Sequence, residues 1–240
     1  LTSPFDLFLQ ERRIYLHLAE VVAETIYGYS ISDDEMRERV SYHNLELVER
    51  LAKQYGGVMV MLGHYGNWEG FSDIAKRVNN PAITVCSVYR ELKNKAFDQL
   101  MADIRAQRGT DLTEKKHILR EMVRRRKEGI VTLYGMISDQ KPSPQNAHYW
   151  TQFLHQDTSF LDGSEVLGRK FGYPVVMYYV TSPCRGYYNV DIRLLSEHPN
   201  EETDFAVTER YARMLEQNIL QQPELWLWTH NRWKYKREEV

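Results

Sequence analysis

Short apolar runs alternate with segments of helical period along this chain, and this alternation limits the possible folds more than any other feature. The run at residues 58–62, VMVML, is continuous and flanked by glycines, as is typical of a strand buried on both faces. Further strands are expected at residues 82–88, 130–136, 175–180 and 189–195, and helices at residues 67–78, 93–107, 113–127, 163–171 and 204–221. The alternation predicts an α/β fold with a mainly parallel sheet flanked by helices.

The first 55 residues are expected to be helical. Apolar residues recur at helical spacing from Phe5 to about Tyr27. Ser32 is a predicted N-cap that starts a second helix, which ends at the next pair of glycines. No linker or internal repeat interrupts the sequence, so the chain is predicted to be a single domain over residues 1–240, with residues 1–55 as its helical N-terminal part.

Charge and cysteine content argue against several classes of protein. The chain has 31 basic and 33 acidic side chains and a formal net charge of -2, which argues against broad electrostatic binding of nucleic acid. Its 2 cysteines are too few for a disulfide scaffold or a four-thiolate zinc site, and they favour a reducing compartment. No run approaches the roughly 18–20 apolar residues of a membrane-spanning helix. Because the sequence begins with Leu1 rather than methionine, we expect that an upstream signal or membrane anchor is missing.

The segment GHYGNWE at residues 63–69 directly follows the first predicted strand. Ligands of open α/β sheets bind outside the carboxyl ends of the strands, so His64 lies where catalysis is expected. A histidine accepts a hydroxyl proton near neutral pH, and a carboxylate on its other ring nitrogen orients it. Glu69 is the candidate carboxylate; since five residues of a regular helix turn by about 140°, the pair requires a turn, which Gly66 permits. The alternative is a strand-end histidine bonded to backbone and a solvated glutamate.

The same segment resembles the first motif of the glycerolipid and lysophospholipid acyltransferase superfamily, in which four residues separate a histidine from an acid. It is most similar to the motif of the late acyltransferases of lipid A biosynthesis, which also carries Gly-Asn-Trp before the acid. Four further blocks of that branch are matched in order, by residues 88–94 (VYRELKN), 138–141 (SDQK), 153–158 (FLHQDT) and 228–234 (WTHNRWK). The sequence departs from the branch at Glu91, where proline is common, and at Leu154 and His155, where Phe-Gly is common.

The resemblance implies which residues form the site. His64 and Glu69 would be the catalytic pair, and the substrates would be bound by Gly66, Asn67, Trp68, Tyr89, Arg90, Asn94, Asp139, Gln140 and Thr158. Arg90 follows a predicted strand, and its guanidinium suits a phosphate or a polar head group. Asp139 and Gln140 either orient Arg90 or the acceptor, or cap the loop that follows them. Thr158 either binds substrate or ends a loop.

Such an enzyme would transfer a fatty acyl chain from acyl carrier protein or acyl-CoA to a hydroxyl of a membrane lipid, and the branch implies a lipid A precursor as the acceptor. Acyl transfer needs a base for the acceptor, donors for the oxyanion and cations for the phosphates of the substrates. No metal and no resident cofactor are expected, since the acyl thioester is a co-substrate. The resemblance also implies a membrane surface as partner, no nucleic acid, and action at the cytoplasmic face of the inner membrane through the missing anchor.

Three other functions stay open on the sequence alone. The acceptor of an acyltransferase is alternatively a lysophospholipid or an amino-acid lipid, and water as acceptor would make the protein a thioester hydrolase. A catalytically silent lipid-binding protein would be favoured if the side chains of His64 and Glu69 lay apart, or if no apolar groove lay beside His64. The sequence contains no G-x-S-x-G elbow, P-loop, G-x-G-x-x-G or H-E-x-x-H motif, which argues against the enzyme classes that use them.

Two segments are candidates for contact with a membrane. Residues 115–127 form a predicted basic helix with an apolar face, which either lies on anionic lipid or packs that face into the core. Residues 225–236 combine tryptophans with basic side chains, a composition that fits either a membrane interface or core tryptophans followed by a charged tail.

Overall fold

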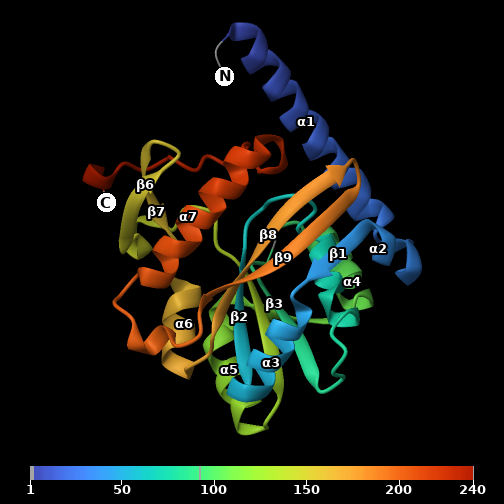
Figure 1. The fold of residues 1–240 in the computed structure, drawn as a ribbon, viewed down its shortest axis with the longest axis vertical. Coiled ribbons are helices and arrows are strands. Elements are labelled where there is room, and N and C mark those ends of the chain that lie inside the picture. Colours follow the sequence, from blue (N-terminus) through green and yellow to red (C-terminus); the bar gives the residue numbers. More distant parts are fainter. Residues whose placement is uncertain (1–2, 92, 240) are drawn as a thin grey trace.

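A seven-stranded sheet forms the centre of the computed structural model, which describes residues 3–91 and 93–239 (Figure 1). Its strands, in the spatial order β1-β9-β8-β2-β5-β3-β4, are β1 (Val40–His43), β2 (Gly57–Leu62), β3 (Ile83–Tyr89), β4 (Thr110–Glu114), β5 (Val131–Ile137), β8 (Val175–Cys184) and β9 (Tyr187–Ser196). Neighbouring strands are parallel, while β8 and β9 form an antiparallel hairpin. The predicted α/β fold with a mainly parallel sheet is confirmed.

Helices flank this sheet, and a small hairpin stands apart from it. The helices are α1 (Pro4–Tyr27), α2 (Asp33–Arg39), α3 (Leu45–Tyr55), α4 (Lys95–Gln107), α5 (Ile118–Lys127), α6 (Gly163–Phe171) and α7 (Ala206–Gln221). The hairpin consists of β6 (Tyr149–Phe153) and β7 (Gln156–Phe160), and a 3-10 helix, η1 (Gly70–Lys76), precedes β3.

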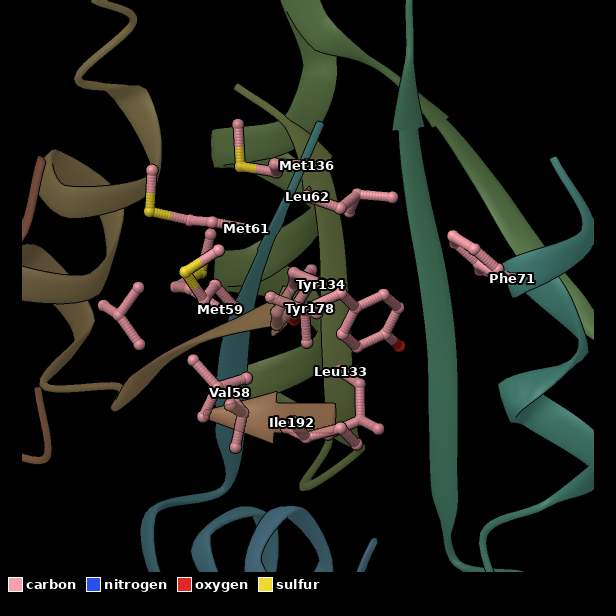
Figure 2. Close-up of a cluster of buried hydrophobic side chains, with 14 of the residues drawn as sticks. Val58, Met59, Met61, Leu62, Phe71, Leu133, Tyr134, Met136, Tyr178 and Ile192 are labelled. Atoms are coloured by element: carbon pink, nitrogen blue, oxygen red, sulfur yellow. The ribbon is translucent and has the colours of Figure 1, made fainter. Parts of the chain in front are cut away.

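Strand β2 lies at the centre of the core, and each of its residues is buried. β5 and β8 pair with its two edges, and α3 and α6 pack on it. Figure 2 shows Val58, Met59 and Met61 of β2 beside Leu133 and Tyr134 of β5. A strand with this environment must be apolar at successive positions, which explains the continuous run that predicted it.

The N-terminal part is helical at its start, as predicted, but not throughout. α1 spans the expected residues, and the hydroxyl of Ser32 accepts a hydrogen bond from the backbone of Glu35 at 3.2 Å, as an N-cap should. The single helix expected after Ser32 is wrong, because β1 interrupts it and pairs in parallel with β9. Asn44, with φ of 64°, then turns the chain into α3. The open edge of β9 offers a row of backbone partners, and this non-local pairing overrides the local helical pattern.

Two further helices differ from prediction. Only the 3-10 helix η1 forms within residues 67–78. The helix expected at residues 113–127 begins five residues late, at Ile118, because β4 occupies its start and pairs with β3. The hairpin of β6 and β7 was not predicted either. Its turn residues, Leu154 and His155, both have positive φ, without the Asn or Gly that usually marks such a turn.

Both candidate membrane segments of the sequence pack against protein. Helix α5 buries Ile118 and Met122 but leaves Leu119 and Val123 exposed. Two of its arginines, Arg124 and Arg125, pair with nearby carboxylates. Trp226 is buried and contacts the rings of Trp228 and Trp233 edge to face. Within residues 3–91 and 93–239, no helix combines the length and apolar character needed to cross a bilayer.

Candidate active site

The candidate site lies at the carboxyl edge of the sheet, where β2 and β5 end side by side. Leu62 ends β2 and is paired with Ile137, which ends β5. Two residues beyond these positions, His64 and Asp139 meet, with Nδ1 of His64 at 2.8 Å from Oδ1 of Asp139. The register of two parallel strands therefore brings a histidine and a carboxylate together at the edge where ligands of such sheets bind.

Asp139 is buried, with 3% of its surface exposed, and accepts three hydrogen bonds. Besides the ring of His64, the backbone N–H of His64 and the indole N–H of Trp226 donate to Oδ2, each at 2.9 Å. An ionised carboxylate can only accept, so Nδ1 of His64 carries the proton. Nε2 is then left free to accept a proton from a substrate.

The two side chains shift each other's pKa in opposite directions. Burial lowers the pKa of His64, but the charge and hydrogen bond of Asp139, together with the charge of Glu69, outweigh it and raise the pKa above 6.5. Burial raises the pKa of Asp139, but His64 and the indole of Trp226 outweigh it and hold the pKa below 3.8. Asp139 is therefore ionised, and His64 is a stronger base than a free imidazole.

Glu69 is not the hydrogen-bond partner of His64, which corrects the expected pair. Its carboxylate instead accepts from Nε and Nη2 of Arg105, in α4, at 2.9 and 2.8 Å. The physical reason is that Asp139 already occupies Nδ1 of His64, while Arg105 neutralises Glu69 in a two-pronged ion pair. Glu69 acts on His64 through its charge alone.

The C-terminal segment at residues 225–227 fixes the loop that carries His64. The N–H of Gly66 donates to the carbonyl of Leu225 at 2.9 Å, and the N–H of Leu227 donates to the carbonyl of His64 at 3.0 Å. Trp226, between them, holds Asp139 through its indole. One short segment thus supports both members of the pair.

Gly66 provides the turn that the sequence predicted. Its φ is +61°, in the left-handed region that favours glycine. A Cβ at this position would lie 3.2 Å from the ring of Tyr188 and from a methyl of Val180. The absence of a side chain therefore also lets the β8–β9 hairpin pack against the loop.

The next two residues of the loop have different surroundings. Asn67 is buried; its amide donates to Glu24 of α1 at 2.9 Å, and its carbonyl oxygen accepts from the N–H of Gly70 at 3.1 Å. Asn67 thereby ties the loop to α1. The ring of Trp68 stands edge to face against His64, with centroids 5.2 Å apart.

Trp68 also lines a narrow apolar cleft beside His64. The opposite wall comes from α1 and the C-terminal segment, with Ile14, Leu18, Val21, Leu227 and Trp228 among the lining residues. The cleft is connected to His64 only through the ring of Trp68, because His64 itself does not line it.

The side chain of His64 is partly exposed, and its Nε2 lies near a second polar group. The His64 side chain is 18% exposed, and the amide nitrogen of Gln140 lies 3.4 Å from its Nε2. An amide N–H at that place can donate to the free lone pair of His64, or to an oxygen that replaces it. In the described part of the chain, no group of three acidic, histidine or cysteine side chains is arranged to hold a metal ion.

The other residues implied by the resemblance lie farther out. Tyr89 ends β3, and Arg90 follows it, exposed, at the same edge of the sheet but two strands from β2. Asn94 caps α4 by accepting from the backbone of Ala96 and Phe97, and Leu92 of the same block lies outside the described residues. Thr158 is buried in β7, where it accepts from the indole of Trp233 at 2.8 Å.

Three residues near the pair were not among the expected site residues: Arg105, Trp226 and Arg232. Trp226 and Arg232 lie in segments that the sequence marked for other reasons, as a candidate membrane contact and as part of the last matched block. Burial lowers the pKa of Arg232 to about 10, and the negative charge of Asp139 opposes that shift, so a buried guanidinium lies near the pair. A signal for the role of Asp139 was present, because it follows its strand at the same distance as His64 follows β2. Using that signal requires knowing that β2 and β5 are neighbours.

Comparison with known proteins adds one match. The model of the family described as bacterial lipid A biosynthesis acyltransferase matches residues 12–235, which is nearly the whole chain. The comparison with curated proteins gives no significant match.

Proposed function

The chain belongs to the bacterial lipid A biosynthesis acyltransferase family, and from this premise we propose that it transfers a fatty acyl chain from a thioester to a hydroxyl of a lipid A precursor. The acyl donor is a thioester of acyl carrier protein or of CoA. The reaction takes place at the cytoplasmic face of the inner membrane. The observation that carries the proposal is the His64–Asp139 pair at the carboxyl edge of the sheet, beside an apolar cleft.

His64 is the general base in this proposal. The acceptor hydroxyl replaces the amide of Gln140 at Nε2, and its proton moves to Nε2 as its oxygen bonds to the thioester carbon. The imidazolium is stabilised by the ionised Asp139. Collapse of the tetrahedral intermediate breaks the C–S bond, and the leaving sulfur takes the proton back from Nε2. Acylated lipid and free thiol are released, and His64 is again neutral.

Other side chains take supporting parts. Glu69, held by Arg105, adds negative charge near the imidazolium. Gln140 is placed to donate to the oxyanion of the intermediate. Arg90, exposed at the same edge of the sheet, is the proposed contact for a phosphate of donor or acceptor, with Tyr89 beside it. Trp68 is the proposed wall for the acyl chain.

The remaining residues that the resemblance implies as substrate-binding are better explained as supports of the structure. Gly66 and Asn67 shape the loop, Asn94 starts α4, and Thr158 anchors Trp233. Their effect on substrate is therefore indirect, through the position of the residues they hold.

The geometry favours an enzyme over a silent lipid-binding protein. Glu69 does not contact His64, which by itself would favour a silent protein. Asp139 supplies the missing carboxylate, however, and a buried, ionised partner that fixes the tautomer of a reachable histidine is what a general base requires.

The test is transfer of a labelled acyl chain by purified protein. We expect acylated lipid A precursor from the wild type, and a rate about 10²–10⁴-fold lower for His64→Ala, since a general base contributes about this much. His117→Ala, at an exposed position in the turn before α5, is the matched control and should leave the rate unchanged. Full activity of His64→Ala would contradict the assignment. Release of free fatty acid without acylated lipid would identify a hydrolase, and modification of only a lysophospholipid or amino-acid lipid would change the acceptor.

A further inference from the structure

The outer face of α1 is apolar along most of its length. We define this face by six exposed side chains: Phe5, Phe8, Tyr15, Leu16, Val22 and Ile26. Each of them is at least 50% exposed, and two reach 66%. A surface helix of a globular protein normally turns its apolar stripe toward the core and its polar side chains toward water, so a second apolar face on the outside of α1 is unusual.

The helical geometry shows that these side chains share one face. At 100° per residue, the six side chains and the exposed Ala19 and Ala23 fall within an arc of about 120°, in which Arg12 is the single charged residue. The inward side of α1 is mixed. Ile14, Leu18 and Val21 line the cleft there, and beside them His17 is buried and Glu24 is bonded to Asn67 and Tyr188. The apolar face is therefore free to contact something outside the chain.

The position of α1 leaves this face open. Figure 1 shows α1 running past the end of the sheet, with its N-terminal half clear of the other labelled elements. The face is too wide for the narrow seam of a two-stranded coiled coil, and it combines phenylalanines with a tyrosine, residues that suit the zone between headgroups and acyl chains. Arg12 and Arg13 are exposed, and neither has an ion-pair partner among the described residues. On the helix, Arg12 lies within the face and Arg13 about 60° beyond one edge, while the exposed Glu11 lies about 20° beyond the other. The positive charges therefore outnumber the negative one beside the apolar face, which matches an anionic lipid surface.

The inward side of the same helix lines the cleft next to the candidate base. Ile14, Leu18 and Val21 form one wall of that cleft, and Trp68, on the other side, touches His64. A bilayer in contact with the outer face of α1 would thus lie one helix diameter, about 10 Å, from the cleft.

We propose that the outer face of α1 docks the enzyme on an anionic bilayer. The helix lies in the plane of the membrane, its apolar side chains enter the boundary between headgroups and acyl chains, and Arg12 and Arg13 contact lipid phosphates. The acceptor lipid then reaches His64 along the bilayer surface rather than through water. The choice of a lipid surface as the partner rests on the proposed function. The existence of the exposed apolar face is observed in the structure and does not depend on that function.

Flotation of the 240-residue chain with vesicles tests the docking. The probe is a vesicle of phosphatidylethanolamine and phosphatidylglycerol, compared with one of phosphatidylcholine alone. We expect the wild type to float with the anionic vesicles, and Phe8→Gln/Ile26→Gln to bind at least about tenfold more weakly, because two inserted apolar side chains are lost. Arg12→Gln should weaken binding to the anionic vesicles and not to the neutral ones. Val166→Gln, at a 51% exposed position of α6, is the matched control and should bind as the wild type does.

The test separates failure of the docking from failure of the proposed function. In detergent micelles containing the acceptor, Phe8→Gln/Ile26→Gln should transfer acyl chains at the wild-type rate, because its site is intact. Absence of transfer by every form would refute the function and leave the flotation result standing. The docking is refuted if the wild type stays with the unbound protein or if the double variant floats equally well. A wild-type dimer that Phe8→Gln/Ile26→Gln converts to a monomer would assign the face to a second copy of the chain and overturn the proposal.

Discussion

Asp139 governs the proton affinity of His64, and substitution of its carboxylate should be visible in the pH dependence of the reaction. His64 must be neutral to act as a base, so the rate falls as pH drops through its raised pKa. Asp139→Asn removes the negative charge that favours the imidazolium, so the pKa of His64 falls and the acid limb of kcat/KM moves to lower pH. The rate on the plateau should fall by about 10²-fold or more, because the amide no longer fixes the reactive tautomer.

Glu69→Gln is the comparison for that experiment. Glu69 affects His64 by charge only and is held by Arg105, so its loss should move the acid limb less than the loss of Asp139 does. pH profiles of both variants, measured with one acyl donor, decide the matter. An unchanged acid limb in Asp139→Asn, or a larger shift in Glu69→Gln, would return the partner role to Glu69.

The loop between β2 and η1 depends on Gly66 for its shape and for its packing. Gly66→Ala places a side chain at a φ of +61° and against Tyr188 and Val180. Gly129 has a φ of +69° but open space around its missing Cβ, so Gly129→Ala isolates the conformational cost, about 1–2 kcal/mol. We expect Gly66→Ala to lower the free energy of unfolding by about 1–3 kcal/mol more than that, because its neighbours must move. Urea titration of the two variants measures the difference, and equal losses would mean that the contact is harmless.

The elements predicted well from the sequence are those whose own residues carry the pattern of burial along their whole length. β2 is apolar throughout because helices pack on it and bury every one of its side chains, and α6 forms over the residues expected for it. β1 and β4 were missed because each is a short edge strand whose partner, β9 or β3, comes from elsewhere in the chain. The β6–β7 turn was missed because Leu154 and His155 adopt positive φ without the residues that announce it. In these cases contacts distant in sequence decide the local conformation.

The sequence indicated the position of His64 in the fold, but not its contact with Asp139. The position of His64 after a buried strand could be read directly, because strand ends hold ligands in this class of sheet. The partner of His64 could not be read from the sequence. Asp139 is recognised as a neighbour of His64 only once β5 is known to lie beside β2. Trp226 and Arg105 reach the same place from the C-terminal segment and from α4. The positions of Trp226 and Arg105 in the sequence do not indicate that they lie near His64.

The whole molecule should gain stability from the His64–Asp139 pair in a defined pH range. The folded pKa of Asp139 is lowered, so its contribution is present above its unfolded value of about 3.8 and is lost as pH falls. The folded pKa of His64 is raised, so its contribution is present below about 6.5 and is lost as pH rises through the folded value. Both contributions are present between these limits.

Asp139→Asn should therefore destabilise the protein more at about pH 5.5 than at a pH above the raised pKa of His64, where His64 is neutral in the folded wild type. Urea unfolding of wild type and variant at the two pH values gives the comparison. His64→Ala removes the charged partner and should abolish the pH dependence of the loss. An equal loss at both pH values would show that the pair is not ionised as described.

Residues 225–227 also set the moment at which a newly made chain becomes an enzyme. They hold the His64 loop and Asp139, yet they are synthesised long after either of them. At about 5–20 residues per second, the ribosome needs roughly ten to thirty seconds to travel from His64 to Leu227. In the later part of that interval, once Asp139 has been made, β2 and β5 are both complete, but the segment that locks their ends together is not. We expect the unfinished chain to leave acyl thioesters untouched until this late segment emerges and closes over the loop.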